Sequence, residues 1–153
     1  MGKMVPTKSN LFLVMALLVG LASTSTGMAA EEMTVYKSPT CGCCKKWVTH
    51  LEQNGFKVKS VDMQNVIPKK IELGITQQTA SCHTGVINGY VIEGHVPASD
   101  IKRLLKEKPA NAIGLSVPGM PIGSPGMEQG SRKDDYSVLL IDKTGRTRVY
   151  SRH

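Results

Sequence analysis

The sequence predicts an α/β domain with a mixed central sheet flanked by helices, and three observations support this fold class. Short β-rich runs alternate with segments of helical periodicity after residue 30. The pair Asn88-Gly89 separates two apolar runs, which is the strongest short hairpin signal that a sequence offers. Three of the four cysteines lie between the first predicted strand and the first predicted helix.

The first half of the predicted domain has the order β-α-β-α. Residues 34–37 form a short β-rich run, and Ser38-Pro39-Thr40 suits a turn followed by a helix cap. The next segment predicts a helix that ends near Asn54-Gly55. Its apolar residues recur every three or four positions, at Cys44, Trp47, Val48 and Leu51. Residues 56–61 then predict a second strand, and residues 67–74 a short helix.

The second half of the domain adds a β-hairpin, a third helix and a C-terminal extension. Residues 85–92 predict the hairpin, and residues 97–108 predict a helix that begins at a proline and ends before one. The order β-α-β-α-β-β-α, with cysteines after the first strand, is the thioredoxin plan. Residues 114–130, rich in glycine, proline and methionine, predict a long, positioned loop. Residues 137–150 predict an added C-terminal hairpin that extends the sheet.

The first 29 residues have the pattern of a secretory signal peptide. Two lysines precede the apolar run 11–22, and small residues lead to a predicted cleavage site after Ala29. The apolar run is shorter than the roughly 20 residues that span a bilayer. We therefore expect a periplasmic or otherwise exported protein, without a stable membrane anchor after cleavage, that consists of one domain over residues 30–153.

The charge of the chain is mildly basic and points away from nucleic acid. Loss of Lys3 and Lys8 with the signal lowers the Lys and Arg count from 19 to 17, against 12 acidic residues, so the net charge falls from +7 to +5. The basic residues are spread along the chain and lack the interleaved aromatic residues of a surface on which single-stranded bases stack. We expect no nucleic-acid partner.

The sequence Cys41-Gly42-Cys43-Cys44 concentrates thiols at the start of the first predicted helix. Cys43 and Cys44 can hardly bridge each other, because a disulfide requires its two Cα atoms to lie farther apart than neighbouring residues do. Unpaired N–H groups and the helix dipole favour thiolates at a helix N-terminus. The cluster therefore predicts sulfur ligands for a soft metal ion.

The fourth cysteine, Cys82, is expected to join this cluster. In a thioredoxin plan the loop that enters the third strand packs against the redox turn, and here that loop is residues 79–84. Thioredoxins usually carry a cis-proline at this point, whereas this chain has Cys82-His83. Replacement of that proline by two ligating residues would favour metal binding.

Three alternatives remain open from the cysteines alone. Two structural disulfides are the ordinary expectation for an exported chain with four cysteines. Zinc suits a set of three cysteines and one histidine, although structural zinc motifs normally use two separated pairs of ligands. Cys41 and Cys44 also form a C-x-x-C motif, which predicts a thiol-disulfide oxidoreductase and leaves Cys43 without an obvious purpose.

Several motifs resemble the CopG-type periplasmic copper-resistance proteins. They include residues 36–44, 81–84, 91–98 and 117–121, and the similarity extends from about Met33 to Tyr150. The resemblance implies a thioredoxin-like domain that binds copper through Cys41, Cys43, Cys44 and Cys82, with several ions in a cluster as one form of that site. It also implies a role in changing the oxidation state of copper.

Two histidines and two methionines are further candidate ligands. His83 follows Cys82 directly, and His95 precedes a predicted helix; loop or turn packing is the alternative for each. Met120 and Met127 lie in the proline-rich loop and offer thioethers to copper(I), or they fill gaps as hydrophobic anchors.

The sequence thus predicts an exported protein of copper tolerance that holds copper(I) in a thiolate site and interconverts copper(I) and copper(II). The expected partners are copper ions and a periplasmic redox or copper-transfer protein. Whether the chain is an enzyme stays open, because a thiol-disulfide oxidoreductase and a copper chaperone without catalytic activity are the two alternatives.

Overall fold

The computed structural model describes residues 1–3 and 31–153. Apart from residues 1–3, the predicted signal peptide lies outside the described residues, as does its cleavage site after Ala29. The elements are β1 Glu32–Lys37, α1 Gly42–Gln53, β2 Lys57–Asp62, α2 Ile67–Glu72, β3 Thr84–Ile87, β4 Tyr90–Glu93, α3 Ala98–Glu107, β5 Ala112–Ser116, β6 Ser137–Asp142 and β7 Thr147–Arg152.

A mixed sheet runs through the described part of the chain and confirms the predicted α/β class. Its seven strands have the order β2-β1-β3-β4-β5-β6-β7. β1 pairs in parallel with β2, and β4 with β5, whereas the other neighbours are antiparallel. The Asn88-Gly89 turn joins β3 to β4, and both of its residues have positive φ angles, as a type I′ hairpin turn requires.

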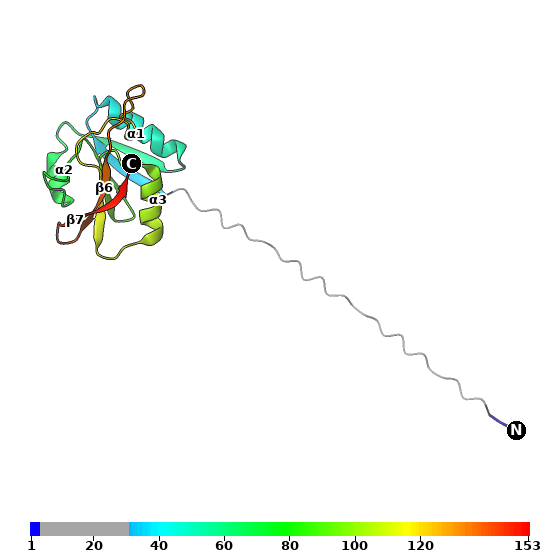
Figure 1. The fold of residues 1–153 in the computed structure, drawn as a ribbon. Coiled ribbons are helices and arrows are strands. Elements are labelled where there is room, and N and C mark those ends of the chain that lie inside the picture. The colour runs from blue at the N-terminus through cyan, green and yellow to red at the C-terminus, as the bar shows by residue number, and fades with distance from the viewer. Residues whose placement is uncertain (4–30) are drawn as a thin grey trace.

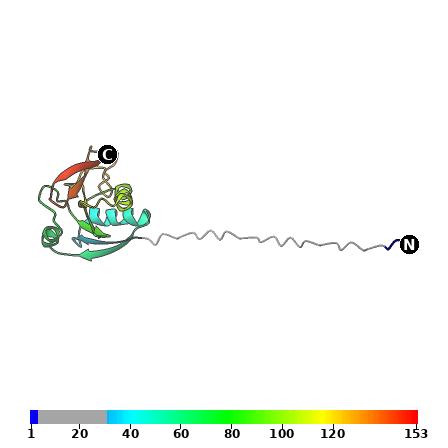
Figure 2. The ribbon, with the colours of Figure 1, turned by 90° about the horizontal axis from the view of Figure 1, so that it is seen from below.

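The helices cover both faces of this sheet. Figure 2 shows α1 and α3 side by side over one face, with α2 away from them, and Figure 1 gives the same arrangement from the front. Trp47 and Leu51 of α1 share the main core with Ile101 and Leu104 of α3. A smaller apolar cluster, on other residues of the same strands, contains Val91 and Ile141 together with Ile75, which follows α2. Alternate strand residues therefore serve opposite cores.

The predicted loop over residues 114–130 is wrong at its start, because residues 112–116 form β5. β5 lies between β4 and β6 and so connects the C-terminal hairpin to the rest of the sheet. Gly114 made this segment look like a loop in the sequence. In the structure the same glycine allows two strands to pack closely. A Cβ at this position would lie 1.7 Å from the carbonyl oxygen of Val91, so only glycine allows β5 to pair this closely with β4.

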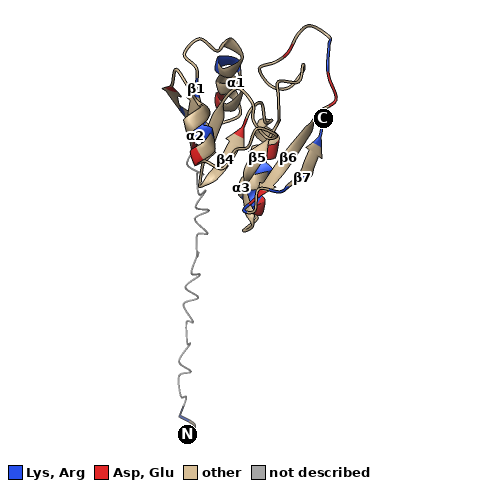
Figure 3. Cartoon of the chain, turned by 90° about the vertical axis from the view of Figure 1, so that its left-hand side faces the viewer, with Lys and Arg blue, Asp and Glu red and all other residues tan. Residues whose placement is uncertain are grey.

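Charged residues are distributed over several elements. Figure 3 shows Lys and Arg on helices and strands alike, with Asp and Glu among them. Among residues 1–3 and 31–153, no helix has both the length and the apolar character needed to cross a membrane.

Candidate metal centre

The N-terminus of α1 holds three of the four cysteines. Cys41 is the N-cap residue, and its sulfur accepts a hydrogen bond from the backbone N–H of Cys44 at 3.3 Å. Cys44 is fully buried, whereas Cys43 is partly exposed. The N-cap residue and the first turn of α1 thus place three sulfur atoms at one end of the helix.

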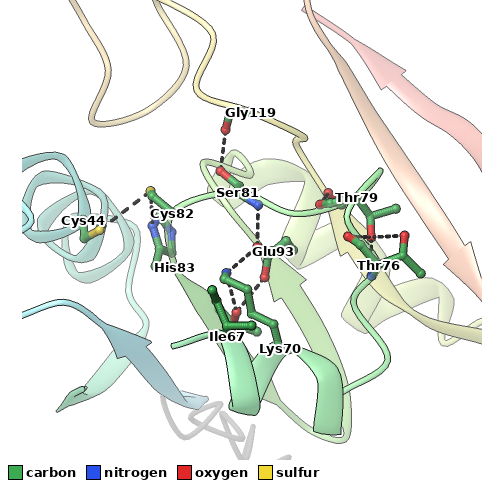
Figure 4. A network of polar contacts seen from close by, with 12 residues as sticks. Cys44, Ile67, Lys70, Thr76, Thr79, Ser81, Cys82, His83, Glu93 and Gly119 are labelled. Atoms are coloured by element: carbon green, nitrogen blue, oxygen red, sulfur yellow. Dashed lines mark hydrogen bonds and ion pairs between the residues drawn. The ribbon is translucent and has the colours of Figure 1, made fainter. Parts of the chain in front are cut away.

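The structure brings Cys82 to this trio, from 38 residues farther along the chain. Its Sγ lies 3.7 Å from Sγ of Cys44, and Figure 4 shows this contact between the helix end and the loop before β3. Sγ of Cys43 lies 3.3 Å from Sγ of Cys41. All four sulfur atoms lie within 4.8 Å of one another.

The four sulfurs are not paired into two disulfides. Cys41 and Cys44 form one disulfide bond, with their Cα atoms 5.4 Å apart, and Cys43 and Cys82 are free thiols. The structure therefore shows the oxidised form of the C-x-x-C pair beside two reduced sulfurs. This arrangement can exchange electrons at one pair while it keeps soft ligands at the other.

His83 and His95 both contact the Cys82 sulfur. Nδ1 of His83 and Nε2 of His95 each lie 3.0 Å from it, and these three side chains form a second candidate ligand group. Nδ1 of His95 lies 2.8 Å from the carbonyl oxygen of Pro125. Because a carbonyl can only accept, Nδ1 carries the proton, and neutral His95 directs its Nε2 lone pair at Cys82.

His83 is packed in the core beside the sulfurs. Its ring is fully buried, with its centroid 4.2 Å from that of Trp47 and 4.9 Å from that of His95. Its Nε2 has no hydrogen-bond partner among the described residues. An unpaired buried imidazole nitrogen is unfavourable, so His83 carries one unsatisfied polar atom in addition to the Nδ1 that contacts Cys82.

Burial sets the protonation states of this group. Burial, helped by the nearby Cys43 thiol, raises the pKa of Cys82 to about 12, although the Lys70 charge acts in the opposite direction. Burial also lowers the pKa of His83 well below its ordinary value, and that of His95 to a smaller extent. The metal-free form thus holds a neutral Cys82 thiol beside two neutral imidazoles, and a metal ion bound there would displace the thiol proton.

The segment after β5 covers this group, and we refer to residues 117–127 as the covering loop. Its Pro125 carbonyl meets His95, and its Gly126 lies against the backbone of α1. Gly126 has a φ angle of +86°, and a Cβ there would lie 2.8 Å from the Cys43 carbonyl oxygen and the Trp47 nitrogen. This glycine is therefore required for the loop to approach the helix.

The two methionines of the covering loop differ in exposure. Met120 is 53% exposed at the turn after Gly119, whose N–H donates to the Ala80 carbonyl at 3.1 Å. Met127 is partly buried, and its N–H donates to the Ser124 carbonyl at 2.8 Å. Ligation by either thioether stays a prediction.

Sequence reasoning missed a buried polar group beneath Cys82. Glu93, at the end of β4, is fully buried. Its carboxylate forms an ion pair with the ammonium group of Lys70 of α2 at 2.5 Å. The available signal was a carboxylate at the end of the otherwise apolar run Val91-Ile92. A charge in such a position is almost always paired when it is buried.

The mixed α/β fold and the sulfur and imidazole ligands define a candidate soft-metal-binding protein. A family model described as "Protein of unknown function, DUF411" matches residues 79–127. A solved structure named "Copper resistance protein copG- Form 2" is 44% identical, with a TM-score of 0.77, over 81% of this chain and 98% of its own. The "Form 1" structure is 45% identical, with a TM-score of 0.75, over 80% of this chain and 96% of its own. A search of the curated proteins found no match. The chain belongs to the CopG copper resistance family.

Proposed function

We propose that this chain is an exported, thioredoxin-like protein of copper tolerance that binds copper(I) through Cys41, Cys43, Cys44 and Cys82. The observation that carries the proposal is the meeting of four sulfur atoms within 4.8 Å of one another. Two solved structures over 40% identical to this chain are named as copper resistance proteins, which supports copper as the metal.

The thioredoxin-like assignment is supported by topology. The first four strands lie in the order β2-β1-β3-β4, and a C-x-x-C pair opens the helix that follows β1. β5, β6 and β7 would then be an addition to that plan. Export is supported by the signal pattern of residues 1–29, and it would supply the oxidising surroundings in which the Cys41–Cys44 disulfide persists.

The donor set suits copper(I) better than a hard cation. Thiolates and imidazoles are soft or intermediate ligands, and no carboxylate takes part in either candidate group of the described residues. Cys82 belongs to both candidate groups, so its sulfur could bridge two copper ions. A bridging sulfur of this kind is what a cluster of several ions requires. His83 and His95 are the additional ligands we favour, since both approach Cys82 as neutral rings.

The disulfide supplies a route to interconvert the two oxidation states. In the reduced protein, Cys41 and Cys44 would each give one electron to a copper(II) ion. An S–S bond would form, two thiol protons would leave to solvent, and two copper(I) ions would result. Cys43 and Cys82 would remain reduced to hold copper(I), and a periplasmic dithiol protein would reduce the disulfide again.

Copper titration of the reduced protein tests the binding site. Under anaerobic conditions, with the chromophoric copper(I) chelator bathocuproine disulfonate as competitor, we expect more than one copper(I) ion per chain. Cys82→Ser should lower the stoichiometry, while His50→Gln, on the far part of α1, should leave it unchanged. A wild-type protein that binds no copper(I), or a Cys82→Ser variant with full stoichiometry, would contradict the proposal. A single ion per chain would instead indicate a chaperone that only binds and transfers copper.

Copper(II) spectroscopy tests the redox step. Mixing reduced protein with two equivalents of copper(II) should remove the electron paramagnetic resonance signal, and mass spectrometry should find one Cys41–Cys44 disulfide per two ions reduced. Cys41→Ser should keep the signal. Persistence of copper(II) in the wild type would rule out this step and leave binding alone.

A second candidate function is thiol-disulfide exchange on protein substrates. The observation in its favour is the Cys41–Cys44 disulfide at the start of a helix. Insulin reduction by metal-free protein measures it. Activity that is abolished by Cys41→Ser and unaffected by Cys82→Ser would favour this function, since the metal site needs both residues.

A further inference from the structure

A buried ion pair lies directly beneath the Cys82 segment, which we define as residues 79–84. Glu93 is 0% exposed and Lys70 is 6% exposed. Desolvation of two charges offsets most of their attraction, so such a pair is weak support for stability by itself. Its position relative to the ligands is more informative than its charge.

The Glu93 carboxylate holds the Cys82 segment at both sides of its ligands. Its Oε1 accepts from the Ser81 backbone N–H at 2.6 Å, and its Oε2 accepts from the Thr84 hydroxyl at 2.6 Å. Ser81 and Thr84 are the residues immediately before and after Cys82-His83. Figure 4 shows the Glu93 carboxylate below the Ser81 N–H, with the ammonium group of Lys70 beside it.

Lys70 completes this arrangement from α2. Its ammonium group donates to Glu93 Oε1 at 2.5 Å and to the Thr84 hydroxyl oxygen at 2.9 Å. It therefore balances the carboxylate charge and also holds one end of the clamped segment. Figure 4 shows that α2 approaches the site through this side chain.

Glu93 also lies next to the turn that carries His95, the second histidine in contact with Cys82. Glu93 precedes His95 by two residues, and the intervening Gly94 donates its N–H to the His83 carbonyl at 3.0 Å. Gly94 has a φ angle of +73°, and a Cβ there would lie 2.4 Å from the Ser81 hydroxyl. The turn that carries His95 is thus packed against the segment that carries Cys82 and His83.

We propose that Glu93 is a positioning residue for the copper site, with Lys70 and Thr84 as its partners. It fixes the backbone on both sides of Cys82-His83, so that the thiol and both imidazoles meet as preorganised ligands. This role rests on the copper-binding function proposed above. It adds that the ligand geometry is set by a buried hydrogen-bond acceptor that bonds to the backbone and hydroxyl beside the ligands and to no ligand atom.

Two double variants separate positioning from charge. Lys70→Met with Glu93→Gln removes both charges and keeps an amide oxygen that can accept from Ser81. Lys70→Met with Glu93→Leu removes the charges and the acceptor. We would measure thermal unfolding, copper(I) affinity against bathocuproine disulfonate, and the alkylation rates of Cys82 and Cys43 by iodoacetamide in metal-free protein with the disulfide intact.

The variant without the acceptor should lose copper(I) affinity by about tenfold or more, the usual effect of removing a group that orients a metal ligand. Its Cys82 alkylation rate should rise severalfold relative to Cys43, while the Gln variant stays close to wild type in both measurements. Equal effects in the two double variants, or a folded Leu variant with wild-type affinity and alkylation, would overturn the proposal.

A third variant covers the case in which the Leu variant does not fold. Thr84→Val removes the hydroxyl that donates to Glu93 with almost no change in volume, and it should shift affinity and Cys82 alkylation in the same direction to a smaller extent. A folded Thr84→Val variant with wild-type copper(I) affinity and wild-type Cys82 alkylation would then contradict the positioning role of Glu93. Absence of copper(I) binding in the wild type would defeat the proposed function, whereas the alkylation results would still test the positioning of Cys82.

Discussion

Burial sets the protonation states of Cys82, His83 and His95. The two imidazoles at Cys82 are neutral because their environment disfavours charge, and the same burial keeps the Cys82 thiol protonated in the metal-free form. These are the states from which a soft metal ion can bind with release of a single thiol proton. Copper uptake at this group should therefore depend on the removal of that proton.

His83 provides a test of ligation against packing. Phe at this position would keep the aromatic contact with Trp47 and remove both ring nitrogens. We expect His83→Phe to lower copper(I) affinity by at least about tenfold, or 1.4 kcal/mol, with little loss of thermal stability. Competition with a copper(I) chelator measures the affinity. An unchanged affinity would show that the ring only packs against Trp47.

His50, away from the sulfurs, predicts a pH dependence of stability. Burial, partly opposed by the Glu128 charge, lowers the pKa of His50, and its neutral Nε2 accepts from the Ala98 N–H at 3.1 Å. A folded-state pKa below the unfolded value means that this stabilisation is present above about pH 6.5 and is lost as the pH falls.

The variant His50→Gln keeps an acceptor that does not titrate. In urea unfolding of metal-free protein, the stability of the wild type relative to His50→Gln should therefore decrease from pH 7.5 to pH 5.5, by up to about 1 kcal/mol for one partly exposed hydrogen bond. Chemical denaturation at the two pH values measures this. A difference that does not change with pH would contradict the assignment.

At the scale of elements, the candidate metal site lies where three chain segments meet. The N-terminus of α1 supplies three sulfurs, the Cys82 segment supplies a thiol and an imidazole, and the turn after β4 supplies His95. The covering loop lies over them through Pro125 and Gly126. The hydrogen bonds of this loop make it an ordered cover and set it apart from a flexible linker.

Gly126→Ala tests the contact between the covering loop and α1. Gly126 has a left-handed backbone conformation, and the added methyl group would collide with the backbone of α1. We therefore expect a loss of about 1–3 kcal/mol in the free energy of unfolding. Gly130→Ala is the matched control, because Gly130 also has a positive φ angle, +59°, but open space where its Cβ would lie. Equal losses for the two variants in urea denaturation would show that the loop does not press on the helix.

Local sequence patterns predicted the elements well wherever periodicity and turn chemistry agreed. The Asn88-Gly89 hairpin and the helix opened by the cysteines lie where the patterns place them. β5 was missed because the requirement for Gly114 comes from its approach to Val91, a contact across the sheet that local composition does not encode.

The candidate site was accessible from sequence only in part. The cysteine spacing and the expected loop placement pointed to a cluster of four sulfurs. The pairing of Glu93 with Lys70 was not accessible, because the two residues lie 23 positions apart and meet only through the packing of α2 against the sheet. The disulfide state of Cys41 and Cys44 likewise depends on geometry, since spacing alone left metal, zinc and redox roles open.

At the scale of the whole molecule, the proposed export signal precedes every described element of the fold. The described sheet and both apolar cores are formed by residues after position 31. If residues 1–29 are an export signal, the protein recovered from the periplasmic fraction should have the intact mass of residues 30–153. N-terminal sequencing should then begin at Ala30. Recovery of the full-length chain only from the cytoplasm would contradict export.

The most direct test of the central claim is X-ray absorption at the copper K-edge on the reduced, copper(I)-loaded protein. We expect a copper(I) edge and coordination dominated by sulfur, with a nitrogen contribution that His83→Phe decreases and a sulfur contribution that Cys82→Ser decreases. Coordination by nitrogen and oxygen alone, or a Cys82→Ser spectrum identical to that of the wild type, would contradict a copper site built from these four sulfurs.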